Sequence, residues 1–83
     1  MQRAIVLPDL GAGPLRLSVW FADPGDAVYE GDRLVEVVGG GVTFDVPAPA
    51  TGRLAEQCAL PDDPVVPGQV LGLIHVDEGP MPG

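Results

Sequence analysis

The stretch PGDAVYEGDRLVEV at residues 24–37 has a second, gap-free copy in the same chain, PDDPVVPGQVLGLI at residues 61–74. The two share the frame P-x-D-x-V-x-x-G-x-x-L-x-x-[VI] at an offset of 37 residues (61 − 24), and the Arg-Leu pair at 16–17 matches that at 53–54 at the same offset. Each half is too short to enclose a core alone, and two copies are too few for a solenoid. The repeat therefore predicts one domain whose halves pack on each other about a pseudo-two-fold axis.

Each position of the shared frame has a physical role. The aspartate can start an Asx-type turn, and the valine can fill the core. The glycine permits the positive φ of a sharp turn into the next strand, where the leucine begins a run of alternation. In the two copies these residues are Asp26 and Asp63, Val28 and Val65, Gly31 and Gly68, and Leu34 and Leu71.

Short apolar segments between glycines and prolines predict an all-β domain, and no segment has helical periodicity over a helix length. In the segment 15–21, Leu15, Leu17, Val19 and Phe21 are predicted to share one face, directed at the core. The predicted strands are residues 3–7, 15–21, 33–38, 42–46, 53–59 and 70–76, with short bridges at 27–29 and 64–66.

The chain's 83 residues are enough for one domain, predicted at residues 1–77 and followed by a flexible tail at 78–83. The net charge of −8 disfavours nucleic acid and anionic membranes. It fits a solvated acidic surface that aids solubility, or a surface for a basic protein partner. A single cysteine excludes an internal disulfide and favours a cytoplasmic setting. No stretch is long and apolar enough for a membrane span, and the first residues are too short for a signal-peptide core.

Five motifs occur in a fixed order: VLPDLG at 6–11, Trp20 five residues before a Gly-Asp pair, GDAVYEGDRLVEV at 25–37, VPAPATG at 46–52, and PVVPGQVLGLI at 64–74. In this order and spacing the chain resembles a lipoyl/biotinyl domain, the swinging-arm carrier of 2-oxoacid dehydrogenase acyltransferases and biotin carboxylases. The resemblance implies a barrel-sandwich hybrid, a flattened sandwich of two four-stranded sheets. A hairpin would lie at one end and the termini near the other.

The predicted hairpin between 33–38 and 42–46 has a tip of three glycines, Gly39, Gly40 and Gly41. Aligned with the family from either flank, the attachment lysine falls on Gly41 and its preceding aspartate on Gly40. Lipoate and biotin are attached through an amide to a primary amine, which glycine lacks. All four basic residues of the chain are arginines, so no lysine elsewhere can substitute. The resemblance therefore implies a carrier fold without lipoate, biotin or another cofactor.

The segment AGPLRLSV at residues 12–19 is shorter than the family pattern. In the family this loop lies beside the lysine hairpin and helps partner enzymes to recognise it. Its shortening makes recognition by those partners doubtful, in addition to modification.

Four residues remain as candidates for function, namely Cys58, His75, Trp20 and Tyr29. Cys58 could carry an acyl group or react with oxidants, but it aligns with Phe21 in the repeat, which favours a small buried hydrophobic residue. His75 stands alone in the last strand and predicts neither a metal site nor catalysis. Trp20 and Tyr29 are expected on the outer surface, either as cover for the core or as a contact patch.

The remaining acidic residues suggest little beyond turns. Asp62 and Asp63 with Asp26 could form a cation site, but turn chemistry explains them better, and no metal site is expected. No catalytic pair can be assembled, which predicts a protein that is not an enzyme.

Three functions stay open on this basis. The first is a stand-alone interaction or structural module. The second is an accessory subunit that occupies a carrier's docking site on an acyl- or carboxyl-transfer complex. The third is a small homo-oligomeric scaffold in which the bare tip lets another backbone approach closely.

Overall fold

The computed structural model describes residues 1–76, and that part of the chain consists of β-strands, turns and loops with no helix. No predicted boundary differs from the observed one by more than two residues. The predicted tail at 78–83 lies outside the described residues. The strands are β1 (Gln2–Val6), β2 (Leu15–Trp20), β3 (Ala27–Val28), β4 (Arg33–Gly39), β5 (Val42–Pro47), β6 (Gly52–Gln57), β7 (Pro64–Val65) and β8 (Val70–His75).

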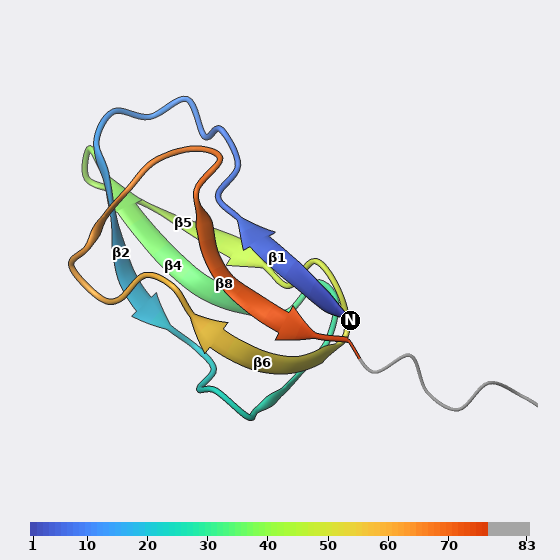
Figure 1. Cartoon of the computed structure of the whole chain (residues 1–83). Coiled ribbons are helices and arrows are strands. Elements are labelled where there is room, and N and C mark those ends of the chain that lie inside the picture. The colour runs from blue at the N-terminus through green and yellow to red at the C-terminus, as the bar shows by residue number, and fades with distance from the viewer. Residues whose placement is uncertain (77–83) are drawn as a thin grey trace, which may run out of the picture.

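The strands form two four-stranded antiparallel sheets, β1-β8-β6-β3 and β5-β4-β2-β7, which face each other as a flattened sandwich (Figure 1). Aliphatic side chains from both inner faces fill the space between the sheets, and no buried residue of the described part is polar or charged. The all-β sandwich predicted from the sequence is therefore confirmed. Within residues 1–76 no helix could cross a membrane.

The pseudo-two-fold repeat extends to individual hydrogen bonds. The Asp26 carboxylate accepts from the Asp23 N–H at 2.8 Å, and the equivalent Asp63 carboxylate accepts from the Leu60 N–H at 2.9 Å. Each aspartate is therefore the last residue of a four-residue turn, and its carboxylate accepts from the N–H of the first residue. The prediction that the aspartate starts the turn was wrong. Val28 and Val65 are buried, as expected for the two core positions.

Glycine is required at the second turn of each half. Gly31 has φ +92° and Gly68 has φ +86°, in the region that side chains other than glycine seldom enter. The prediction from the repeat frame is confirmed at both positions.

The predicted core face of the second strand is wrong beyond Leu17. The register of β2 against β4 shifts between Leu17 and Val19, and a matching shift occurs between Leu54 and Glu56 on β6. Such a bulge adds one residue and reverses which side chains point inward. Val19 and Phe21 are consequently exposed, and Trp20 turns towards the core.

The same reversal exposes Cys58, so the expectation that it is a small buried residue was also wrong. Its repeat partner Phe21 lies 4.5 Å beneath the Arg33 guanidinium, which in turn lies 3.7 Å from the Asp45 carboxylate. These side chains cover the outer face of the second sheet.

The two ends of the sandwich differ in how the chain passes through them. At one end β4 turns directly into β5 at the glycine tip. At the other, β1 begins and β8 finishes side by side, where the Val76 N–H donates to the Met1 carbonyl at 2.8 Å (Figure 1). The expected placement of the hairpin and the termini at opposite ends holds for the described residues.

Candidate functional site

The tip of the β4–β5 hairpin is a two-residue turn. Gly39 pairs with Val42, and the residues between them, Gly40 and Gly41, have φ values of +59° and +77°. Two successive positive φ values correspond to a type I′ turn, whose twist matches the flanking strands and which favours glycine at both positions. A Cβ built at either residue would meet no atom within 4 Å, so the tip has room for side chains but an unfavourable backbone for them.

Gly39 is glycine for a different reason, which was not visible in the sequence. A Cβ there would lie 2.5 Å from Leu15 Cδ2 and 2.7 Å from the Pro14 carbonyl oxygen. The loop that enters β2 therefore passes directly over this residue. Gly39 is thus needed for the close approach of the loop before β2, and Gly40 and Gly41 form the tight turn. Both requirements come from the fold.

We expect Gly39→Ala to cost more stability than Gly40→Asn. The added methyl group must displace a backbone carbonyl, and overpacking of this kind costs about 1–3 kcal/mol. Asparagine adopts positive φ readily and would extend into open space, so Gly40→Asn should cost less than about 1 kcal/mol. Urea denaturation of both variants measures the difference. Equal losses would contradict the close approach at Gly39.

A shallow hollow of about 390 Å³ lies beside the tip and is lined by Pro14, Arg16, Val38 and the three glycines. The loop before β2 forms its rim, so this loop does lie against the hairpin. The lining contains one charged group, the Arg16 guanidinium, and no nucleophile, carboxylate or amine. It can contact another molecule, but its side chains cannot form an amide.

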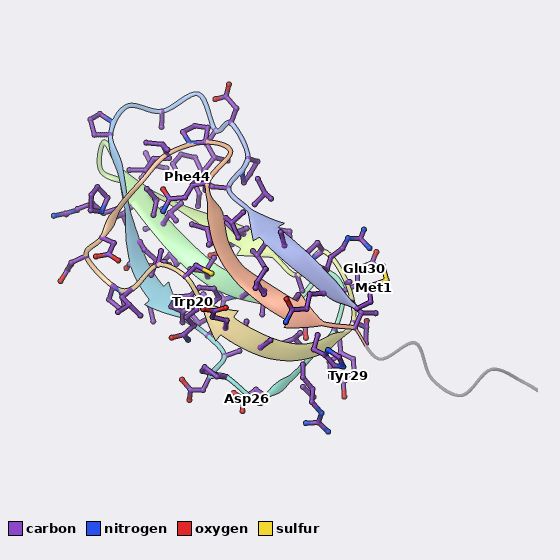
Figure 2. The ribbon with its side chains drawn as sticks, in the orientation of Figure 1. Met1, Trp20, Asp26, Tyr29, Glu30 and Phe44 are labelled. Carbon is purple, nitrogen blue, oxygen red and sulfur yellow. The ribbon has the colours of Figure 1, made fainter. Side chains whose placement is uncertain are left out.

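Trp20 and Tyr29 do not form one surface. Trp20 is half-buried, its indole N–H donates to the Ala59 carbonyl at 2.8 Å, and its ring covers Gly72, where a Cβ would lie 2.8 Å from the ring. Trp20 is therefore cover for the core. Tyr29 is 60% exposed and lies well away from Trp20 (Figure 2). A role for Tyr29 in contacts stays a prediction.

The other candidates are separated from the tip. Partial desolvation raises the pKa of the Cys58 thiol, and the Glu56 carboxylate raises it further, so the thiolate is disfavoured despite its exposure. His75 is exposed on β8. Within residues 1–76 no three His, Cys, Asp or Glu side chains are placed to hold a metal ion.

Three comparisons relate this chain to known proteins. A family model described as "Biotin-requiring enzyme" matches residues 3–74. The dihydrolipoyllysine-residue succinyltransferase component of the 2-oxoglutarate dehydrogenase complex from Bartonella vinsonii subsp. berkhoffii is 36% identical over 77 residues, which is 90% of this chain. The chain spans only 19% of that relative's length.

A solved structure is also similar. The solution structure of the lipoyl domain of the 2-oxoglutarate dehydrogenase complex from Azotobacter vinelandii has a TM-score of 0.70 and 27% sequence identity. The match covers 88% of this chain and 95% of that one.

Proposed function

Because this chain belongs to the biotin/lipoyl attachment-domain family, whose model covers residues 3–74, we propose that it is a lipoyl-type domain that carries no lipoate or biotin. It acts as a non-catalytic protein-interaction or structural module. The observation that carries the proposal is a chain without lysine, with a glycine, Gly41, at the hairpin position to which the flanking motifs assign the attachment lysine. The cytoplasmic setting expected from the single cysteine remains a prediction.

The chemistry of attachment supports this function. An amide to lipoate or biotin needs a side-chain amine that reaches out from the hairpin tip. Gly41 offers no side chain, and its φ of +77° is one that a lysine adopts at a cost of roughly 1–2 kcal/mol. The tip is therefore built for a tight backbone turn, while the arginines of the chain have guanidinium groups that remain protonated.

The proposal is tested by intact-mass measurement after co-expression with a lipoate ligase, and separately with a biotin ligase. We expect the unmodified mass in both cases. A lipoyl or biotinyl adduct on the natural chain would contradict the proposal outright.

The double variant Gly40→Asp/Gly41→Lys tests the position assigned to the missing lysine. The hairpin keeps its length and both new side chains enter open space, so we expect the variant to fold and to gain a lipoyl group in the same co-expression. The matched control Gly40→Lys/Gly41→Asp places the amine one residue away and should be modified far less. Equal modification of the two variants would contradict the assignment of the attachment position to residue 41.

A second function is favoured by the relatives, because both similar proteins have names that place them in a 2-oxoglutarate dehydrogenase complex. In this alternative the chain is an accessory subunit that docks on a 2-oxoacid dehydrogenase-type complex without carrying cargo. Competition between this protein and a lipoylated domain for binding to purified complex components distinguishes the two. Displacement supports the accessory role, and its absence at excess protein leaves the independent module.

A further inference from the structure

Within residues 1–76, each sheet has one long edge strand with no hydrogen-bonded outer neighbour, β1 in one sheet and β5 in the other, and the pseudo-two-fold axis relates the two. The opposite edges are the two-residue strands β3 and β7. At the start of β1 the Met1 carbonyl accepts a hydrogen bond from the Val76 N–H, and just after its end the Leu7 N–H donates to the Gln69 carbonyl. The backbone N–H and C=O groups of the odd-numbered residues are therefore directed towards β8. Backbone groups alternate in direction along an antiparallel strand. The residues whose N–H and C=O groups face away from β8 are Gln2, Ala4 and Val6.

The equivalent edge of β5 is protected against pairing. Leu7 bonds through its N–H and C=O groups to Gln69 and Gly68, and Ala48 makes the same two bonds to Asp32 and Gly31. Leu7 and Ala48 are therefore equivalent positions, 41 residues apart (48 − 7). At the same offset, the outward positions Gln2, Ala4 and Val6 of β1 correspond to Thr43, Asp45 and Pro47 of β5. Pro47 has no N–H to donate, and Asp45 places a carboxylate on the edge. Proline and charge are common means of preventing edge-to-edge association. At these same two positions β1 carries Val6 and Ala4.

The outer surface of β1 and β8 is apolar except at one end, where the exposed Gln2 and His75 pair. Val6 pairs with Val70 on β8, and the two side chains are 47% and 40% exposed. Ala4 pairs with Leu73 in the same face. Although the chain has a net charge of −8, neither β1 nor β8 contains an aspartate or glutamate. Two copies that meet at this edge therefore bring no carboxylate of β1 or β8 into the contact, and Glu56, which pairs with Leu73, lies one strand further from the edge.

We propose that β1 pairs antiparallel with β1 of a second copy of this chain, centred on Ala4. This register places Gln2 opposite the Val6 of the other copy. The backbone N–H and C=O groups of Gln2, Ala4 and Val6 are all directed outward, so those of the two copies can hydrogen-bond to each other. Arg3 then lies opposite Ile5, so the two like charges are not directly opposed. The two sheets become continuous across the contact, and the glycine tips stay free. This inference does not depend on the proposed absence of lipoate.

The expected dimer is weak and has a distinctive salt dependence. One short strand pair buries less surface than a standard stable interface, so half-dimerisation is expected between roughly 0.1 and 1 mM protein. Each copy carries a net charge of −8, and added salt screens the repulsion between them. The dissociation constant should therefore fall several-fold between low and moderate ionic strength.

Analytical ultracentrifugation of the full chain across this range is the test, with hydrogen exchange at each amide. We expect exchange at Ala4 and Val6 to slow as the protein concentration rises, with no change at Arg3 and Ile5. Ala4→Asp/Val6→Pro transfers the β5 residues to β1 and should leave a monomer. Thr43→Asp adds a charge to the other edge and should dimerise like the natural chain.

Several results would overturn the proposal. These are a monomer at 1 mM protein, an Ala4→Asp/Val6→Pro variant that is folded by circular dichroism and still dimerises, or loss of the dimer in Thr43→Asp. Concentration-dependent protection at the glycine tip, with none at Ala4 and Val6, would assign any self-association to the hairpin instead. If Ala4→Asp/Val6→Pro does not fold, Ala4→Asp alone gives the same comparison.

Discussion

Gly52→Ala, which replaces one hydrogen by a methyl group, is expected to lower the free energy of unfolding by roughly 3 kcal/mol or more. A Cβ at Gly52 would overlap the carbonyl oxygen of His75 and lie 3.0 Å from the Ile74 side chain. Both residues belong to β8, which is held between β1 and β6. Because the obstacle is backbone in the middle of a sheet, no side-chain rotation relieves the overlap.

Thermal unfolding followed by circular dichroism measures this effect. For a domain of this size, 3 kcal/mol corresponds to a fall in Tm of about 12–24 °C. Gly13→Ala is the matched control, since its Cβ would meet nothing within 4 Å and its φ is not positive. The control should unfold within a few degrees of the natural chain. A Gly52→Ala variant that does the same would contradict the packing of β6 against β8.

Truncation of the central leucines should be nearly as damaging. Leu17 and Leu54 occupy equivalent places in the two halves, and each is 0% exposed. A buried leucine replaced by alanine typically costs 2–5 kcal/mol, through lost burial and the cavity that remains. An 83-residue domain has a total stability of only about 4–12 kcal/mol, so either variant should lose a large part of it.

The pseudo-symmetry makes this prediction more specific. Leu17→Ala and Leu54→Ala should have losses within about 1 kcal/mol of each other, because their surroundings repeat. Leu60→Ala is the control, since that side chain is 54% exposed and should cost less than about 1 kcal/mol. Urea midpoints compare all three. A strongly unequal pair would show that the halves are not energetically equivalent.

Much of the fold could be predicted because the repeat carries redundant information. The leucine, valine and glycine positions of one half recur in the other, and each has a local physical reason to be there. The frame thus placed Val28, Val65, Gly31 and Gly68 correctly. The position of the bare tip could also be predicted, since the flanking motifs fix it from both sides.

The errors came from features that short patterns do not contain. Alternation along the second strand predicted a buried Phe21, but a bulge after Leu17 adds one residue and reverses the faces. The same event in the other half exposes Cys58. The role of Gly39 depends on a loop that is distant in sequence, so only the packed structure shows why a side chain is excluded there.

The bond between Met1 and Val76 has a consequence for how this domain can be built into a larger molecule. Met1 and Val76, the first and last described residues, lie together at one pole, and the β4–β5 turn lies at the other (Figure 1). The domain could therefore be inserted as a cassette into a surface loop of a host protein, with its turn presented outward and its tether behind it.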